Sequence, residues 1–264
     1  RQATLTAGDG SVIRVGALRL RLDWTASLLA RAPRMSALEV DGLALSVLRQ
    51  PDGRWQVAGM ATQPGQGGGF GDWLLAQPQV RLSGASVDIA DAGEPARRLH
   101  LEPAYAELQK RGGEHWLDLR VGVVGSAQGA FRLRARMRGL AGDPSTSEGR
   151  AYVTARDLTG ADVPLGAWLF GGQLNGEAWL RWAGGRVQRV HGSIEGQGGL
   201  RPAAGGQGVD LDALRLAGVW QRTADGWAAG VDEWRAEAGE RVWRVDRAYV
   251  RGRGDALSLS AALV

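Results

Sequence analysis

Residues 131–138 read Phe-Arg-Leu-Arg-Ala-Arg-Met-Arg, so every second side chain is apolar and every other one is arginine. Successive side chains of a β-strand point to opposite faces, and this alternation therefore predicts a strand with one apolar and one charged face. The same period of two recurs at 18–23, 43–47, 117–121 and 257–261. The sequence thus predicts a mainly β protein whose strands each have one apolar face.

Glycine-rich turns separate the apolar runs. The chain has 41 glycines among 264 residues, about twice the usual share of roughly 7%. Many fall in turn sequences such as Arg111-Gly112-Gly113 and Ala183-Gly184-Gly185, where hairpins need positive φ. Further strands are expected near 80–90, 97–108, 150–157, 173–182, 186–196, 209–221, 227–236 and 241–250. The spacing is typical of antiparallel strands joined by hairpins.

Helices are expected to be few and short. The candidates are Trp24–Arg31, Gly71–Gln77 and Val163–Phe170, each about two turns long, which is too short to be stable alone. Asp143–Ser147 is expected to be an exposed loop because Asp, Pro and Ser are frequent in turns.

A glycine-rich stretch, Gln63–Gly69, is predicted to be a flexible linker. It gives an N-terminal segment at 1–62, a linker at 63–71 and an extended β-segment at 72–264. The sequence opens on Arg1 and stops within an apolar alternation at Val264, which leads us to expect a fragment of a longer protein. No apolar run reaches the roughly 18–20 residues that span a bilayer.

Residue patterns typical of enzymes are missing from the sequence. There is no cysteine, no Gly-x-Ser-x-Gly elbow, and no metal-ligand spacing around His100, His115 or His191. Asp88 and Asp91 could form a carboxylate pair, but alternation places Asp88 on a solvated face and Asp91 in the following turn. We therefore expect no enzymatic activity, no catalytic residue, no metal and no cofactor.

Two surface features have alternative interpretations. The arginines Arg132, Arg134, Arg136 and Arg138 could meet anionic lipid head groups, or could form the solvated face of one strand. The 11 tryptophans are expected to pack at sheet rims, with sugar stacking as the alternative. Basic and aromatic residues do not interleave on one face, so a nucleic-acid partner is not expected.

An apolar sheet face must be covered. A second sheet would give a sandwich, closure would give a barrel, and a hydrophobic ligand could replace either. The alternation alone leaves these three solutions open.

The N-terminal third has a more specific pattern. A strand at 12–24 leads into Ser27-Leu28-Leu29-Ala30-Arg31-Ala32-Pro33, then Leu38-Glu39-Val40-Asp41-Gly42-Leu43 and Asp52-Gly53-Arg54-Trp55. This order, with Asp72-Trp73-Leu74-Leu75 and the strand at 80–89, resembles the AsmA-like proteins, specifically their YhdP-like branch.

The resemblance implies a fold and a function. The fold would be an elongated, curved antiparallel sheet of the repeating β-groove type with a few short helices. The protein would lie in the periplasm, held to the inner membrane by an N-terminal anchor that this sequence lacks. Its groove would bind phospholipid acyl chains and conduct phospholipids between the inner and outer membranes, with other envelope proteins as further partners.

The predicted lipid-groove residues are the apolar positions of the alternating strands, and a slip of one residue would move them to the other face. They are Leu18, Leu20, Leu22, Leu43, Leu45, Val47, Val80, Leu82, Val87, Ile89, Leu117, Leu119, Val121, Phe131, Leu133, Met137, Leu257 and Leu259. Two alternatives stay open: a structural or assembly scaffold that binds envelope proteins, and a carbohydrate-binding β-module.

Overall fold

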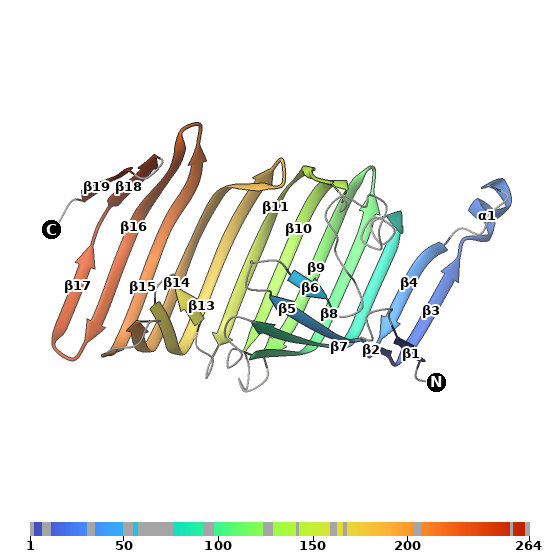
Figure 1. Cartoon of the computed structure of the whole chain (residues 1–264), viewed down its shortest axis with the longest axis horizontal. Helices are drawn as coiled ribbons and strands as arrows, with labels where there is room; N and C mark the ends of the chain where they lie inside the picture. The colour runs from blue at the N-terminus through green and yellow to red at the C-terminus, as the bar shows by residue number, and fades with distance from the viewer. Residues whose placement is uncertain are drawn as a thin grey trace. The chain divides into compact units, whose positions relative to one another are not determined.

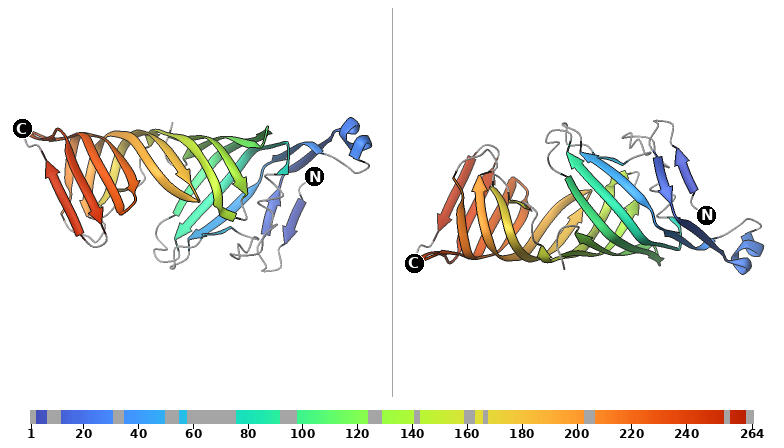
Figure 2. Two further views of the ribbon diagram at one scale, coloured as in Figure 1. Left: turned by 90° about the horizontal axis from the view of Figure 1, so that it is seen from above. Right: turned by 90° about the horizontal axis from the view of Figure 1, so that it is seen from below.

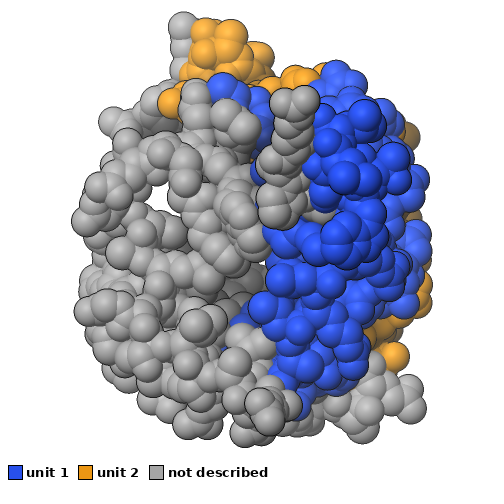
Figure 3. All heavy atoms as spheres, turned by 90° about the vertical axis from the view of Figure 1, so that its right-hand side faces the viewer, with its two compact units in different colours: residues 1–124, 132–147 blue, residues 125–131, 148–264 orange. Residues whose placement is uncertain are grey.

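Antiparallel β-strands make up almost all of the computed structural model (Figure 1). It describes residues 3–6, 12–30, 35–49, 55–57, 76–91, 98–123, 129–140, 143–158, 163–165, 168–202, 207–253 and 256–261. Contacts divide the chain into two compact units, coloured separately in Figure 3. Unit 1 contains residues 1–124 and 132–147, and unit 2 contains residues 125–131 and 148–264. The predicted fold class, a mainly β protein built on an antiparallel sheet with a few short helices, is confirmed, and the sheet is open with almost no helix.

Unit 1 combines short N-terminal strands with longer ones. Its elements are β1 (Ala3–Thr6), β2 (Val12–Val15), β3 (Ala17–Leu22), α1 (Trp24–Ala30), β4 (Met35–Asp41), β5 (Ala44–Arg49), β6 (Trp55–Val57), β7 (Gln79–Asp91), β8 (Arg98–Arg111), β9 (Glu114–Val123) and most of β10 (Ala130–Leu140). The strand β11 (Asp143–Leu158) is divided between the units at residue 148.

Unit 2 is a series of long neighbouring strands, visible from two sides in Figure 2. After β11 they are β12 (Val163–Leu165), β13 (Trp168–Ala183), β14 (Arg186–Pro202), β15 (Val209–Thr223), β16 (Gly226–Ala238), β17 (Arg241–Val245), β18 (Ala248–Arg253) and β19 (Ala256–Ala261). Strands β13 to β16 pair with their sequence neighbours in antiparallel register. The hairpins predicted from turn chemistry therefore form.

Glycine conformations at two turns explain why these hairpins are tight. Gly112 and Gly113 have φ of 55° and 81°, and Gly184 and Gly185 have φ of 59° and 66°. Positive φ at both central residues gives a turn whose twist matches that of the flanking strands. The Gly-Gly pairs thus place β8 beside β9 and β13 beside β14.

The pairing of β7 was not anticipated from the sequence. β4 and β5 both pair with β7 in parallel, through Leu38 with Val80 and through Leu45 with Val87. These strands come from opposite sides of the predicted linker, residues 63–71, which lies outside the described residues. The division of the chain at that linker stays a prediction.

Three local predictions differ from the structure. The helix predicted at Val163–Phe170 is wrong, because β12 and the start of β13 form an extended pair with Val163 opposite Phe170; two turns of helix have little intrinsic stability against strand pairing. The loop predicted at Asp143–Ser147 is the beginning of β11. The single strand predicted at 241–250 is broken between β17 and β18, where Arg247 has a φ of 67°.

The first predicted helix is confirmed as α1, whose start is capped by Asp23. The Asp23 carboxylate accepts a hydrogen bond from the backbone N–H of Ala26 at 2.9 Å, which satisfies one of the free donors of the first turn. Of the helix predicted at Gly71–Gln77, residues 71–75 lie outside the described residues. With 7 residues, α1 falls far short of a bilayer span, and within the described ranges no other segment forms a membrane-crossing helix.

Candidate functional site

Apolar side chains of unit 1 line up in rows that run across its strands. One row joins Leu20 of β3, Leu38 of β4, Val80 of β7, Leu108 of β8 and Leu117 of β9, each directly opposite the next. Paired residues project from the same face of a sheet. We call the surface made by this row and those parallel to it the apolar face of unit 1.

Neighbouring rows contain most of the other predicted groove residues. Leu18 lies opposite Val40, which pairs with Leu82, and Ala106 connects Leu82 to Leu119. Ala85, Ala104 and Val121 form the next row, against which Leu43 packs. Leu22 continues the face opposite Met35.

Strict alternation would not place all of these residues on one face. In β7, Val80 and Leu82 have the opposite parity from Val87 and Ile89, but the register shifts between Leu82 and Ala85, where Gly84 has a φ of 58°. Such a β-bulge adds one residue to a strand and reverses the phase of alternation. The irregular spacing of the apolar residues around Gly84 is the sequence signal of this bulge.

The apolar face of unit 1 has a packed centre and an open margin. Leu38, Val80 and Leu108 form a buried cluster against which Val40, Leu117 and Met137 pack. On β3, by contrast, Leu18 and Leu20 are each 57% exposed. Of the predicted residues, those on β3 are therefore accessible to a ligand, and Val80 and Val121 contribute to the packed floor.

Unit 2 has a corresponding apolar face. One row connects Ala151, Leu180, Val190, Trp220, Ala229 and Val250 across six strands. The Cα position of Leu259 lies opposite Val250, and that of Leu257 lies opposite Gly252. These two predicted residues thus take register positions at the end of the unit 2 sheet.

For some of the remaining predicted residues the structure describes side-chain burial, and the others are placed only by the pairing of their backbone positions. Met137 of β10 joins the buried cluster of unit 1. Leu133, from the same strand, and Phe131 are partly buried. Leu45, Val47 and Ile89 are placed by register alone, Leu45 opposite Val87 and Val47 opposite Ile89.

Sequence reasoning missed the centre of the apolar face in unit 2. Its members include Val190, Ile194, Leu216, Trp220 and Trp234, which β14 to β16 bring together. Glycines occupy intervening positions on the same face, among them Gly192 and Gly218, which pair directly. Glycine interrupts an apolar alternation, so the period of two was harder to recognise here than in 131–138. Counting glycine together with the apolar residues at every second position would have revealed the apolar face of unit 2.

The opposite face of unit 1 is charged and internally neutralised. Glu39 lies 3.8 Å from Arg81, and Arg81 lies 3.1 Å from Glu107. Glu107 also accepts hydrogen bonds from Gln109 at 2.8 Å and Gln79 at 2.6 Å. These hydrogen bonds, the one from Gln109 first, lower the pKa of Glu107 to about 2 although burial opposes the shift.

The arginines of 131–138 also belong to this charged face. Arg132 binds Asp118 through two nitrogens, at 3.2 and 2.7 Å, and lowers the pKa of that carboxyl. Arg136 and Arg138 pair with Glu114, whose pKa is lowered mainly by its hydrogen bond to Arg136. These arginines therefore form a solvated strand face, the second of the two interpretations, and carboxylates of β9 balance their charge.

His100 lies between two carboxylates. Its Nδ1 is 2.5 Å from Asp88 and its Nε2 is 3.2 Å from Glu102, and both hydrogen bonds, the one to Asp88 first, raise the pKa of the imidazole. All three side chains are well exposed. Within the described ranges no group of His, Asp and Glu has the arrangement of a metal site.

Comparison with known proteins identifies a family. No curated protein and no solved structure matches the chain. The family described as YhdP protein matches residues 3–263, which is almost the whole sequence and includes both units. This family is of the AsmA-like lipid-transport type, a non-enzymatic group of cell-envelope proteins. A sheet with one continuous apolar face per unit, and a match over nearly every residue, show that the chain belongs to the YhdP family.

Proposed function

We propose that the apolar faces of both units bind phospholipid acyl chains, and that this chain is a non-enzymatic segment of a conduit that moves phospholipids between the inner and outer membranes. The observation that carries the proposal is the row structure of these faces. Apolar residues and glycines follow one another across the paired strands β3, β4, β7, β8 and β9 of unit 1, and across β11, β13, β14, β15, β16 and β18 of unit 2.

A continuous apolar surface solves the main physical problem of moving a lipid through water. Each CH₂ group withdrawn from water contributes about 0.8 kcal/mol, so exposing two acyl chains with about 30 such groups to water would cost over 20 kcal/mol of free energy. A surface that offers apolar contact along its whole length avoids this loss. Backbone hydrogen bonds of the sheet stay satisfied by neighbouring strands, and no reactive group is needed.

Accessible leucines support binding rather than simple core packing. Leu18 and Leu20 stay 57% exposed although Leu20 lies opposite the buried Leu38 and Leu18 opposite the half-buried Val40 of the same strand. Leaving large aliphatic side chains in water is unfavourable, and a contiguous exposed apolar patch commonly marks an interaction site. An acyl chain laid over β3 would cover these side chains and extend the packed cluster.

The cellular setting that follows from the proposal is the periplasm. The full-length protein would be held to the inner membrane by an N-terminal anchor, with other envelope proteins as further partners. Phospholipid acyl chains are the ligand, and neither a cofactor nor nucleic acid takes part.

Photocrosslinking can test the proposal at pairs of adjacent residues that lie on the same strand but project from opposite faces of the sheet. A photoreactive amino acid would replace Leu20 or, in unit 2, Leu216, and the controls would replace Arg19 and Arg215 on the other face of the same strands. We expect phospholipid adducts, identified by mass spectrometry of protein purified from bacterial membranes, at Leu20 and Leu216 and not at the controls. Equal labelling of both faces would contradict the proposal.

A charge introduced on the accessible margin gives a second test. Leu18→Glu with Leu20→Glu should reduce co-purified phospholipid at least about fivefold without unfolding the protein, because both side chains are already solvated. The matched control is Arg19→Glu between them. Lipid-free wild-type protein that captures envelope proteins would instead support the scaffold alternative.

A further inference from the structure

The polar face of unit 2 contains a row of aromatic side chains. Tyr152, Trp179 and His191 lie opposite one another on β11, β13 and β14, and the same row continues through Val219 and Gly230 to Tyr249. The ring centroids of Tyr152 and Trp179 are 4.9 Å apart, and those of Trp179 and His191 are 5.6 Å apart. With strands about 4.8 Å apart, the row is roughly 24 Å long. We call it the aromatic row.

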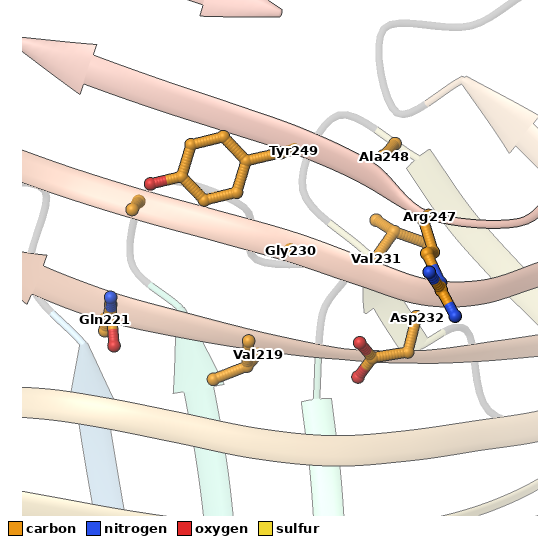
Figure 4. A pocket seen from close by; sticks show the side chains of 9 residues that line it. Val219, Gln221, Gly230, Val231, Asp232, Arg247, Ala248 and Tyr249 are labelled. Atoms are coloured by element: carbon orange, nitrogen blue, oxygen red, sulfur yellow. The ribbon is translucent and has the colours of Figure 1, made fainter. Parts of the chain in front are cut away.

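A hollow lies at the β18 end of the aromatic row (Figure 4). It has a volume of about 340 Å³ and is lined by Val219, Gln221, Gly230, Asp232 and Tyr249, with Arg247 at one side. Because Gly230 has no side chain, the floor between Val219 and Tyr249 is open backbone. The Tyr249 side chain is 45% exposed, and no described aromatic ring stacks on it. Arg247 extends toward the strand of Asp232, whose carboxylate points toward Val219.

Three arginines form the next row on the same face. Arg150 lies opposite Arg181, and Arg181 lies opposite Arg189. All three are exposed, and none forms an ion pair with a carboxylate in the part of the chain that the structure describes. The nearest acid along β13, Glu177, is four residues from Arg181, about 13 Å, and accepts a hydrogen bond from Tyr152 at 2.7 Å.

Like charges directly opposite one another destabilise a sheet. Other arginines on the polar faces meet carboxylates, as Arg132 meets Asp118 and Arg215 meets Glu233. A row of unneutralised guanidinium groups beside a hollow indicates an anionic ligand, because guanidinium binds carboxylate and phosphate groups through paired hydrogen bonds.

From this juxtaposition we propose that the polar face of unit 2 binds an anionic oligosaccharide, a chain of sugar rings that bear carboxylate or phosphate groups. One ring occupies the hollow against Tyr249, where Gln221, Asp232 and Arg247 meet its hydroxyl groups. The chain follows the aromatic row toward Trp179, and its anionic groups meet Arg189, Arg181 and Arg150. This site is independent of the lipid proposal, since its residues and the apolar face project from opposite sides of the sheet.

Two features favour a saccharide over other polyanions. The carboxylate of Asp232 lines the hollow and can accept hydrogen bonds from the hydroxyl groups of a sugar ring, donors that a bare polyphosphate lacks. The ring centroids of Tyr152, Trp179 and His191 are only 4.9 and 5.6 Å apart along the row, too close for a base to insert between neighbouring rings and stack on both.

The test is a binding measurement with defined probes. Immobilised hexagalacturonate is the anionic saccharide, maltohexaose is its neutral counterpart, and inorganic polyphosphate and phosphatidylglycerol vesicles supply anionic groups without sugar rings. We expect wild-type protein to bind hexagalacturonate more tightly than every other probe. Arg181→Gln with Arg189→Gln should weaken this binding about tenfold or more, whereas Arg19→Gln with Arg241→Gln removes equal charge elsewhere and should leave it unchanged.

The hollow is tested separately from the charge. A Cβ atom at Gly230 would meet only Val219 Cγ1, at 3.5 Å, so Gly230→Leu fills the hollow without straining the backbone. This variant and Tyr249→Ala should each weaken hexagalacturonate binding at least about fivefold. The proposal is overturned if the arginine variant weakens hexagalacturonate binding but neither Gly230→Leu nor Tyr249→Ala weakens it, because the site is then a surface that binds any polyanion. Vesicle binding without hexagalacturonate binding, or binding to no probe, also overturns it.

Discussion

Unit 1 and unit 2 are built from the same alternation but use their two faces differently. In unit 1 leucine and valine fill the apolar face, and Leu38, Val80 and Leu108 form a buried cluster. In unit 2 glycine takes many of the equivalent positions, among them Gly192 and Gly218, which pair directly between β14 and β15. The same period of two therefore gives a floor of packed side chains in one unit and a floor interrupted by glycines in the other.

The polar faces differ as well. On the polar face of unit 1, Arg81 and Arg132 each meet a carboxylate. Unit 2 contains such pairs too, among them Arg215 with Glu233, but it also places Arg150, Arg181 and Arg189 in one row. Carboxylates thus balance the charge of Arg81 and Arg132 in unit 1, whereas the three arginines of this row in unit 2 lie opposite one another.

Filling the glycine floor of unit 2 should have the largest effect on stability. A Cβ at Gly218 would lie 2.4 Å from the carbonyl oxygen of Gly230, so Gly218→Val must displace backbone of the paired strand. We expect a loss of about 3 kcal/mol or more in the free energy of unfolding, measured by denaturant titration.

Gly230→Ala, whose Cβ would have an ordinary contact at 3.5 Å, is the control for this experiment and should change stability by less than about 1 kcal/mol. If Gly218→Val were as stable as the control, the glycines of unit 2 would not be required by close strand approach.

Glu107 should provide the largest single contribution among the polar contacts of unit 1. Its pKa is lowered to about 2, so the contribution is fully present above the unfolded-state pKa and is lost as pH falls through the folded-state pKa. Glu107→Gln should reduce stability by about 2 kcal/mol at pH 7, and the reduction should shrink between about pH 5 and pH 2. A difference between variant and wild type that stays constant over this range would contradict the assignment.

Removing one arginine should destabilise the protein when the arginine lies in unit 1 and stabilise it when the arginine lies in this row of unit 2. Arg132→Gln breaks a two-nitrogen contact with Asp118 and should cost about 1 kcal/mol. Arg181→Gln relieves repulsion from Arg150 and Arg189, and should raise stability by about 0.3 kcal/mol. Both effects should diminish in 1 M salt, where screening is strong. If both substitutions changed stability in the same direction, the proposed difference between the polar faces of the two units would be wrong.

The smallest effect is expected at His100. Because its carboxylate partners raise the imidazole pKa, the contribution is fully present below the unfolded-state pKa and is lost as pH rises through the folded-state value. The pair is well exposed, with 39% and 62% of the His100 and Asp88 side chains accessible, so we expect less than about 1 kcal/mol. Thermal unfolding of His100→Gln and wild type at pH 5 and pH 9 measures it, and the two proteins should converge at pH 9.

Much of the fold could be predicted from local sequence. Alternation at 117–121 and 131–138 identified strands because a pleated strand places every second residue on one face. The pair Gly112-Gly113 identified a tight turn because both residues have positive φ. The apolar positions proposed as the candidate site were named on the same basis, and their role in lipid binding stays a prediction.

Other features depend on contacts between distant segments. Val163–Phe170 has the composition of a short capped helix, yet β12 and β13 pair there because neighbouring backbone supplies the hydrogen bonds. The parallel pairing of β4 and β5 with β7 joins residues about 40 positions apart, and no local pattern specifies it. The neutralisation of Arg132 by Asp118 likewise required β9 and β10 to be neighbours.

The sequence by itself determined the strands, their two-faced character and the family, because side-chain alternation and turn glycines act over a few residues. Only the tertiary structure decided that Val80 and Val87 share a face across the bulge at Gly84, and that Arg181 lies between two other arginines. The physical reason is that phase and charge environment depend on register between strands, which is set by hydrogen bonds to partners far along the chain.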